Sequence, residues 1–118
     1  MSRLIANLTV KSKVWLELAG QPVFGDGKAR LLEALRETGS IRGAAERLGM
    51  SYRGAWGRLR EMERRLGEPL IVRRAGGRGG GGSELTDFGK ELLRRYLRFR
   101  QGLNEVVDRR FRRVFMPK

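Results

Sequence analysis

Residues 51–60 (SYRGAWGRLR) carry the side chains whose types and spacing best suit a chemical task. If they form a helix with Ala55 and Leu59 turned inward, the outward face presents hydrogen-bond donors, aromatic rings and a glycine: Ser51, Tyr52, Arg53, Trp56, Gly57 and Arg60. Arginine can donate two hydrogen bonds to guanine, and aromatic atoms can pack on a thymine methyl group. Residues 51–60 contain no acid that would repel phosphate, and the first acid after them is Glu61. The pattern predicts a surface that reads base pairs in a DNA major groove.

A second candidate site is the glycine-rich stretch 73–86 (RRAGGRGGGGSELT). Its arginines and backbone amides can approach phosphates without side-chain clashes, and we expect contacts from Arg73, Arg74, Arg78, Gly79 and Gly80. A nucleotide-binding P-loop requires G-x-x-x-x-G-K-[ST], but residue 82 is glycine where the lysine should stand. A mere spacer is disfavoured because both flanks resemble parts of one fold. The stretch therefore favours a loop that lies on a nucleic acid backbone.

Composition supports a polyanionic partner. The chain has 118 residues and a formal net charge of +13, with no cysteine and no histidine. This composition removes disulfides, most zinc sites and the commonest general base, so we expect no catalysis, no metal and no cofactor. No apolar run approaches the roughly 18 residues of a membrane span, and no signal peptide is evident. We expect a cytoplasmic protein with no membrane partner.

The elements that position these residues can be predicted from spacing. Apolar residues recur at intervals of three and four within 41–48 and 55–66, which predicts two helices over 40–66. Serines suit their N-caps and glycines their C-caps: Ser40, Ser51, Gly49 and Gly67. A short helix, a tight turn and a longer helix form a helix-turn-helix. The alternative is an ordinary helical hairpin, which the acid-free outward face disfavours. We also expect Ser40 to contact DNA.

The flanking segments complete one domain. Residues 8–18 alternate between apolar and polar, and a turn precedes Val23 and Phe24, which predicts an N-terminal β-hairpin over 8–24. A helix is expected over 27–37. Two short strands around the glycine stretch predict a wing over 69–85. The fold class expected for 1–118 is α+β, mainly helical: a single winged helix-turn-helix domain.

A long helix is expected over 86–110, about 35 Å in length, which exceeds what a domain this small needs. Its first half should seal the core, and its second half should pair with another copy of the chain. The expected homodimer interface follows steps of three and four: Phe88, Leu92, Tyr96, Phe99, Leu103 and Val106. The basic, aromatic tail 109–118 either touches DNA or is a solvated end.

The stretch SIRGAAERLGMSYRGAWGRLREM, followed by PLIVRRAGGRGGGGSELTDFGKELL, resembles the N-terminal DNA-binding domain of the ModE family of molybdate-responsive transcription regulators. The features that carry the resemblance are G-S-I, S-Y-x-x-A-W, R-x-x-G-G-x-G-G-G-G and L-T-x-x-G. The likeness extends upstream through VFGDGKARLLEAL. The helix-turn-helix and the helix after it also resemble LysR-type regulators, more distantly.

The resemblance implies a homodimeric winged-helix regulator that binds double-stranded DNA at a palindromic operator. It places the DNA contacts of the recognition helix at Ser51, Tyr52, Arg53, Trp56 and Gly57, and those of the wing at Arg73 and Arg78. Family members continue into a molybdate-binding region, whereas this sequence stops at Lys118. We therefore expect DNA binding without molybdate sensing. A constitutive binder, a signal from a separate effector-binding protein, and regulation unrelated to molybdate all remain open.

Two other functions fit the same residues. A nucleoid-type architectural protein would share the charge and the fold but bind all DNA sequences alike. A protein-interaction adaptor would use the outward Tyr52, Arg53 and Trp56 on a protein surface. RNA binding is less favoured, because the A-form major groove offers a winged helix little to read.

Overall fold

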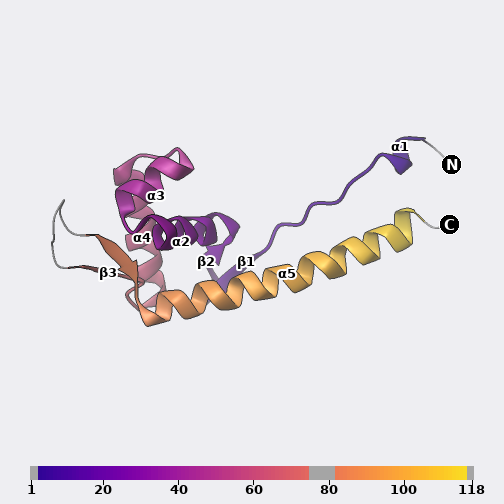
Figure 1. Ribbon diagram of the computed structural model, residues 1–118. Coiled ribbons are helices and arrows are strands. Elements are labelled where there is room, and N and C mark those ends of the chain that lie inside the picture. Colours follow the sequence, from indigo (N-terminus) through magenta and orange to yellow (C-terminus); the bar gives the residue numbers. More distant parts are fainter. Residues whose placement is uncertain (1–2, 75–81, 117–118) are drawn as a thin grey trace.

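The computed structural model describes residues 3–74 and 82–116. A small helical body carries two antiparallel two-stranded sheets, and one long helix projects from it (Figure 1). The elements in chain order are α1 (Arg3–Ala6), β1 (Trp15–Leu18), β2 (Gln21–Gly25), α2 (Asp26–Thr38), α3 (Ile41–Leu48), α4 (Tyr52–Leu66), β3 (Ile71–Arg73), β4 (Ser83–Leu85) and α5 (Asp87–Phe115). None of the described helices is long and apolar enough to cross a membrane.

The helix α2 supplies the centre of the core. Leu31, Leu32 and Leu35 on its inner face are at most 1% exposed, and α3, α5 and both sheets pack around it. The helix ends at Gly39, whose left-handed backbone (φ 77°) lets its N–H donate to the Leu35 carbonyl. The other large, fully buried side chains are Phe24, Leu59, Met62, Leu70 and Leu93.

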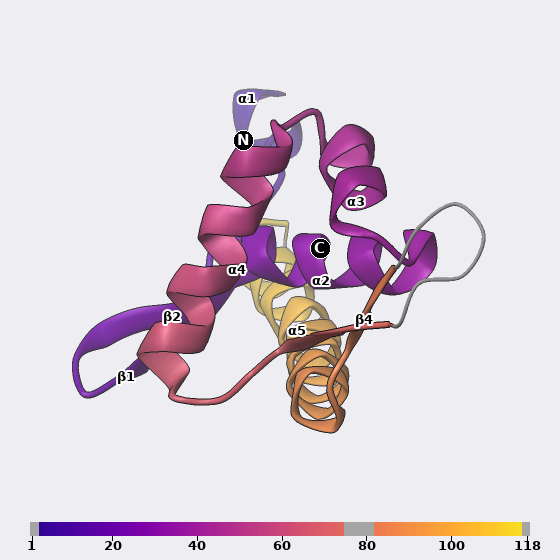
Figure 2. The same ribbon diagram turned by 90° about the vertical axis from the view of Figure 1, so that its left-hand side faces the viewer.

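The helix-turn-helix forms as α3 and α4 (Figure 2). The Ser40 and Ser51 hydroxyls each accept a hydrogen bond from the third backbone N–H of their helix, both at 2.9 Å. Ala44 and Ala45 are buried where α3 meets its neighbours, and only small side chains allow helices to approach so closely. The predicted helix-turn-helix is confirmed.

The wing follows α4 directly. The strands β3 and β4 pair antiparallel, with Ile71 opposite Leu85. The Glu63 carboxylate of α4 accepts hydrogen bonds from the backbone N–H groups of Leu70 (2.8 Å) and Ile71 (3.3 Å), which fixes where the wing begins. The winged helix-turn-helix fold, mainly helical with short strands, is therefore confirmed.

The predicted N-terminal strand is wrong over residues 8–14. Only residues 15–18 pair with β2, because the register places Trp15 opposite Gly25 and the chain then turns into α2. Residues 8–14 are left without a strand partner in the described chain. They still alternate in exposure, with Val10, Ser12 and Val14 half-buried. The sequence pattern indicated one covered face but not what covers it. The long helix also continues past the predicted end at 110, to Phe115.

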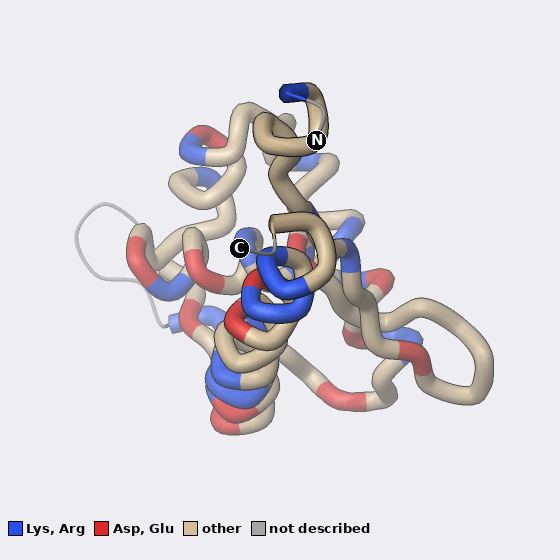
Figure 3. The backbone as a smooth tube through the Cα atoms, turned by 90° about the vertical axis from the view of Figure 1, so that its right-hand side faces the viewer, with Lys and Arg blue, Asp and Glu red and all other residues tan. Residues whose placement is uncertain are grey.

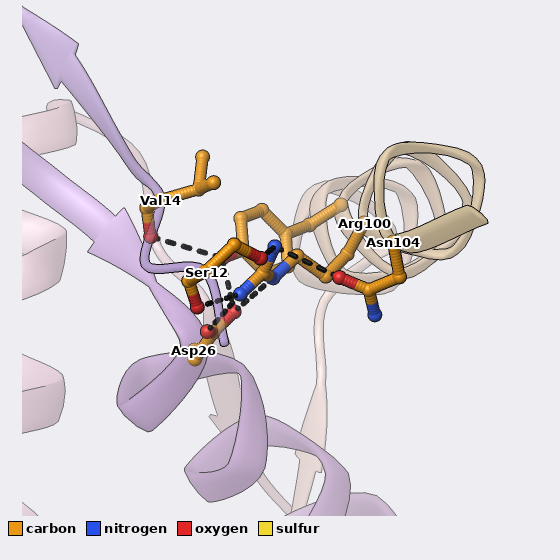
Figure 4. Close-up of polar contacts among 6 residues, drawn as sticks. Ser12, Val14, Asp26, Arg100 and Asn104 are labelled. Atoms are coloured by element: carbon orange, nitrogen blue, oxygen red, sulfur yellow. Dashed lines mark hydrogen bonds and ion pairs between the residues drawn. The ribbon is translucent and has the colours of Figure 1, made fainter. Parts of the chain in front are cut away.

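A polar cluster fastens α5 to the body (Figure 4). The Arg100 guanidinium donates to both Asp26 carboxylate oxygens at 3.1 Å and to the Ser12 carbonyl at 2.6 Å. The Tyr96 hydroxyl donates to the same carboxylate. The Arg100 hydrogen bonds hold the pKa of Asp26 below its usual value. Burial, helped by Asp26, raises the pKa of Tyr96 to about 12, so the hydroxyl keeps its proton at neutral pH.

The start of α5 touches the wing backbone to backbone. Thr86 caps the helix by accepting from the Gly89 N–H at 3.0 Å, and its own N–H donates to the Leu70 carbonyl at 2.9 Å. A Cβ atom placed on Gly89 would lie 2.6 Å from the Leu70 carbonyl oxygen, closer than any real contact. The close approach of α5 to the segment entering β3 therefore requires glycine at position 89.

We predict that Gly89→Ala lowers the melting temperature by several degrees, because the new methyl group must push the Leu70 carbonyl away. Gly102→Ala is the matched control, since it lies in the same helix and a methyl group there would meet no atom within 4 Å. Gly102→Ala should stabilise the protein, by up to about 1 kcal/mol from helix propensity. Thermal unfolding followed by circular dichroism measures both. Equal shifts for the two variants would contradict the steric argument.

We predict that Asp26→Asn lowers the free energy of unfolding by about 1 kcal/mol at neutral pH, an amount that allows for partial exposure of the carboxylate. The folded state lowers the pKa of Asp26, so its contribution is complete above the unfolded pKa of about 3.9. The contribution is lost as the pH falls through the folded pKa. Melting curves from pH 7 to pH 2 should therefore show wild type and variant converging only below about pH 4. Asp108→Asn, an exposed change on α5, should show no such convergence.

Candidate DNA-binding interface

The leading half of α4 presents most of the predicted recognition residues to solvent. Tyr52, Arg53, Gly57 and Arg60 are exposed, as is Ser51 at the cap, while Ala55 and Leu59 point into the core. A Cβ atom added at Gly57 would have nothing within 4 Å, so the helix backbone is open to an approaching surface there. Arg58, which sequence reasoning did not select, is also exposed on this helix.

Trp56 differs from the sequence expectation of a fully outward side chain. It is half-buried and packs against the hydrophobic core. The Arg60 guanidinium lies over its ring, 4.7 Å from the centroid. This cation–π contact favours one position of the exposed Arg60 guanidinium.

Arg42 is a basic residue of this face that sequence reasoning missed. It lies in the first turn of α3, and its guanidinium stacks over the Tyr52 ring of α4 at 5.1 Å. The signal available in the sequence was an arginine two residues after the Ser40 cap, on the side of α3 opposite the buried alanines. The pairing with Tyr52 depends on how the two helices cross, which residue spacing alone does not give.

The structure brings several predicted residues together where the wing meets the helix-turn-helix. Ser40, Tyr52, Arg73 and Arg74 line one hollow of about 350 Å³. Arg73 and Arg74 are both exposed, and the Arg74 guanidinium donates to the Gly39 carbonyl at 3.4 Å. Arg74, next to the end of β3 that adjoins residues 75–81, thus lies beside the end of α2. The predicted wing contacts Arg78, Gly79 and Gly80 lie outside the described residues.

Gly57 and Arg60 line a different surface depression, of about 630 Å³, along the second half of α4. Acids occur there, but Glu61 is paired with Arg64 and Arg65. The hydrogen bonds from these arginines lower the pKa of Glu61, so it stays ionised within a neutralised cluster. The recognition residues thus lie along the helix, and only those at its N-terminal end share the hollow beside the wing.

The residues predicted for a dimer interface divide into two groups. Tyr96 is 2% exposed, and its ring packs edge-on against Phe24 at 5.1 Å, so it belongs to the chain's own core. Phe88, Phe99 and Val106 are exposed, and Leu92 and Leu103 are half-buried. Sequence spacing could not separate the two groups, because the core and the exposed apolar face lie on the same side of α5.

The far end of α5 bears a shallow apolar groove of about 340 Å³. It is lined by Val10, Val106, Val107, Arg110, Phe111, Val114 and Phe115. Arg110 is its one charged lining residue among those described. The helix as a whole is basic, with Lys90 and eight arginines against four acids, and Lys and Arg positions recur along it in Figure 3. The tail residues up to 115 are thus helical and amphipathic.

Comparison with known proteins places the fold in a functional context. The family model described as bacterial regulatory helix-turn-helix protein, lysR family, matches residues 27–90. The molybdenum transport protein ModE of Azotobacter vinelandii is 36% identical over 108 residues, which cover 92% of this chain and 38% of that protein. The DNA-binding transcriptional dual regulator ModE of Escherichia coli (strain K12) is 41% identical over 78 residues, covering 64% of this chain and 29% of that protein.

A solved structure supports the same assignment. The DNA-binding domain of CbnR, determined in complex with DNA, superposes with a TM-score of 0.55 at 27% identity. The match covers 69% of this chain and 87% of that one. The present chain spans between about a quarter and two fifths of the length of the curated relatives above. Its matched region contains the helix-turn-helix and the wing strands, and the chain belongs to the lysR family of bacterial regulatory helix-turn-helix proteins.

Proposed function

We propose that this chain binds double-stranded DNA sequence-specifically as a homodimer and regulates transcription. The observation that carries the proposal is the exposed, acid-free leading half of α4, with Tyr52, Arg53 and Gly57 open to solvent beside a basic wing. In a helix-turn-helix, the N-terminal part of the second helix enters the major groove. The proposal does not extend to molybdenum, because the molybdenum-related names belong to proteins that this chain matches over only part of their length.

The second half of α5 provides the evidence for the proposed homodimer. Phe99 and Val106 are about half exposed, and an apolar groove continues from Val106 to Phe115. A second copy that covers this face would bury apolar surface which the chain itself leaves in water. Two recognition helices related by a dyad would then have to lie about 34 Å apart, one turn of duplex.

Two rival functions differ from this proposal in measurable ways. An architectural protein would bind operator and random DNA with similar affinity, whereas a regulator should discriminate strongly. An adaptor would show no salt-sensitive DNA binding. The charge of +13 favours the DNA-binding functions over the adaptor, and the open Gly57 and exposed Arg53 favour base reading over backbone binding alone.

We predict that selection from random-sequence duplexes with the purified protein yields a palindromic motif. Affinity for that motif should fall about 10³–10⁵-fold between 50 and 200 mM salt if a dimer neutralises roughly 6–10 phosphates. Arg53→Ala should relax base preference at one position per half-site by about tenfold or more, since it removes a base contact. Arg73→Ala should weaken binding to selected and random duplexes by the same factor.

Arg98→Ala is the control for charge alone, because this exposed arginine lies on α5 away from both candidate contacts. It should leave base preference unchanged. Equal effects of Arg53→Ala and Arg73→Ala on selected and random DNA would contradict the assignment of base reading to α4. Recovery of no motif would favour the architectural function, and absence of DNA binding would favour the adaptor.

We predict that Val106→Glu converts the dimer to a monomer. The side chain is 51% exposed in the single chain, so a carboxylate there costs the fold little but cannot be buried in an apolar interface. Sedimentation equilibrium measures the mass of the variant. Thermal melting followed by circular dichroism checks that the monomer is still folded. Arg98→Glu, which adds an acid elsewhere on α5, should leave the dimer intact. A wild-type protein that sediments as a monomer would refute the proposed dimer.

A further inference from the structure

The hollow between the helix-turn-helix and the wing has the composition of an anion site. It is lined by residues from the first turns of α3 and α4, by the Ser40 cap, and by the ends of β3 and β4 that adjoin residues 75–81. The lining residues are Ser40, Ile41, Arg42, Tyr52, Arg73, Arg74, Gly82 and Ser83. Three of these eight are arginines and none is acidic, so the described walls favour a negatively charged occupant.

Ser83 contributes a hydroxyl to the wall of the hollow. It is 7% exposed, and its backbone N–H donates to the Gly39 carbonyl at 2.9 Å. Its hydroxyl, however, makes no hydrogen bond within the described part of the chain. No fully buried side-chain polar atom of the described residues lacks a partner, so this free hydroxyl is the accessible part of Ser83, in the wall of the hollow. A hydroxyl in the wall of a basic hollow can donate to an oxyanion that enters it.

Further donors converge from α3. Ser40 already caps this helix by accepting from the Gly43 N–H, and the Ala44 N–H makes the first intrahelical bond to the Ser40 carbonyl. The backbone N–H groups of Ile41 and Arg42 precede that bond and have no partner among the described residues. Amides at a helix N-terminus favour a negative charge through hydrogen bonding and the helix dipole.

The arginine side chains complete the donor set. The Arg42 guanidinium is held over Tyr52 at 5.1 Å, and Arg42 and Arg73 form no ion pair with any described acid. Both therefore keep their charge available. Since Arg42 is already stacked, it loses less side-chain freedom on binding an anion than a free arginine would.

We propose that this hollow binds one tetrahedral oxyanion, a single phosphate of the DNA backbone, between the Arg42 guanidinium, the α3 amides and the Ser83 hydroxyl. The inference rests on the proposed DNA binding and deepens it. The hollow lies between the recognition helix and the wing, and a phosphate held there is contacted by both elements at once. Arg42 is therefore a positioning residue that sets the register of α4 on the duplex, and it carries no base preference itself.

The test uses a duplex selected by the wild-type protein, in which each phosphate in turn is replaced by a neutral methylphosphonate. One position per half-site should lower the affinity of the wild type about tenfold. Arg42→Gln should bind the unmodified duplex more weakly than the wild type does, by about the factor that the methylphosphonate costs the wild type. Replacing the same phosphate should then weaken the binding of Arg42→Gln no further. Ser83→Ala should show the same pattern of affinity losses, with smaller values. Its melting temperature should be unchanged, because the substitution removes no internal hydrogen bond.

Arg98→Gln is the control that removes the same charge outside the hollow. The affinity of Arg98→Gln should still fall as far as that of the wild type when the critical phosphate is replaced by methylphosphonate. Independent, additive losses for Arg42→Gln and every methylphosphonate would overturn the proposal, while the selected duplex would still establish DNA binding. Failure to select any duplex would instead refute the proposed function.

A second arm separates a backbone phosphate from a free anion. Inorganic phosphate is titrated into the DNA-free protein while the backbone amide signal of Ser83 is followed by NMR. If inorganic phosphate binds weakly or not at all, while the losses from Arg42→Gln and from the critical methylphosphonate are not additive, the occupant is a phosphate of the DNA backbone. A saturable shift that Arg42→Gln abolishes, without any coupling on DNA, would assign the hollow to a free oxyanion and overturn the proposed DNA contact.

Discussion

The Asp26 carboxylate is the point on which the arrangement of this molecule depends. It is the first residue of α2 and receives hydrogen bonds from Arg100 and Tyr96 of α5, while Arg100 also holds the carbonyl of Ser12. Three segments far apart in sequence therefore meet at one charged group. The direction in which α5 leaves the body is set there, and with it the place where a second copy would have to bind.

Much of the helix-turn-helix could be predicted from sequence because its signals are local. Serine caps, left-handed glycines and apolar steps of three and four each act within a few residues, and Ser40, Ser51 and Gly39 behave as their types predict. Arg42 was missed because its partner Tyr52 comes from another helix. Arg74 was predicted to contact DNA. It is exposed, and its guanidinium also donates to the Gly39 carbonyl, a contact between distant segments that residue spacing does not give.

Periodicity indicated which faces are covered without indicating by what. Residues 8–14 alternate as a strand would, but their half-buried side chains come from lying beside α5, and β2 ends before it could pair with them. Tyr96 falls on the apolar face of α5 in step with Phe99, yet the first is in the core and the second is exposed. The boundary between the two is set by where the body ends, a tertiary fact that no window of sequence contains.

The contact between Gly89 and the Leu70 carbonyl has a mechanical consequence. With no side chain between α5 and the segment that enters β3, there is nothing soft to absorb a rotation of the helix. A rotation of α5 at Gly89 would therefore displace the Leu70 carbonyl and, with it, the start of the wing. The contact thus ties the position of the first wing strand to the orientation of the long helix where that helix begins.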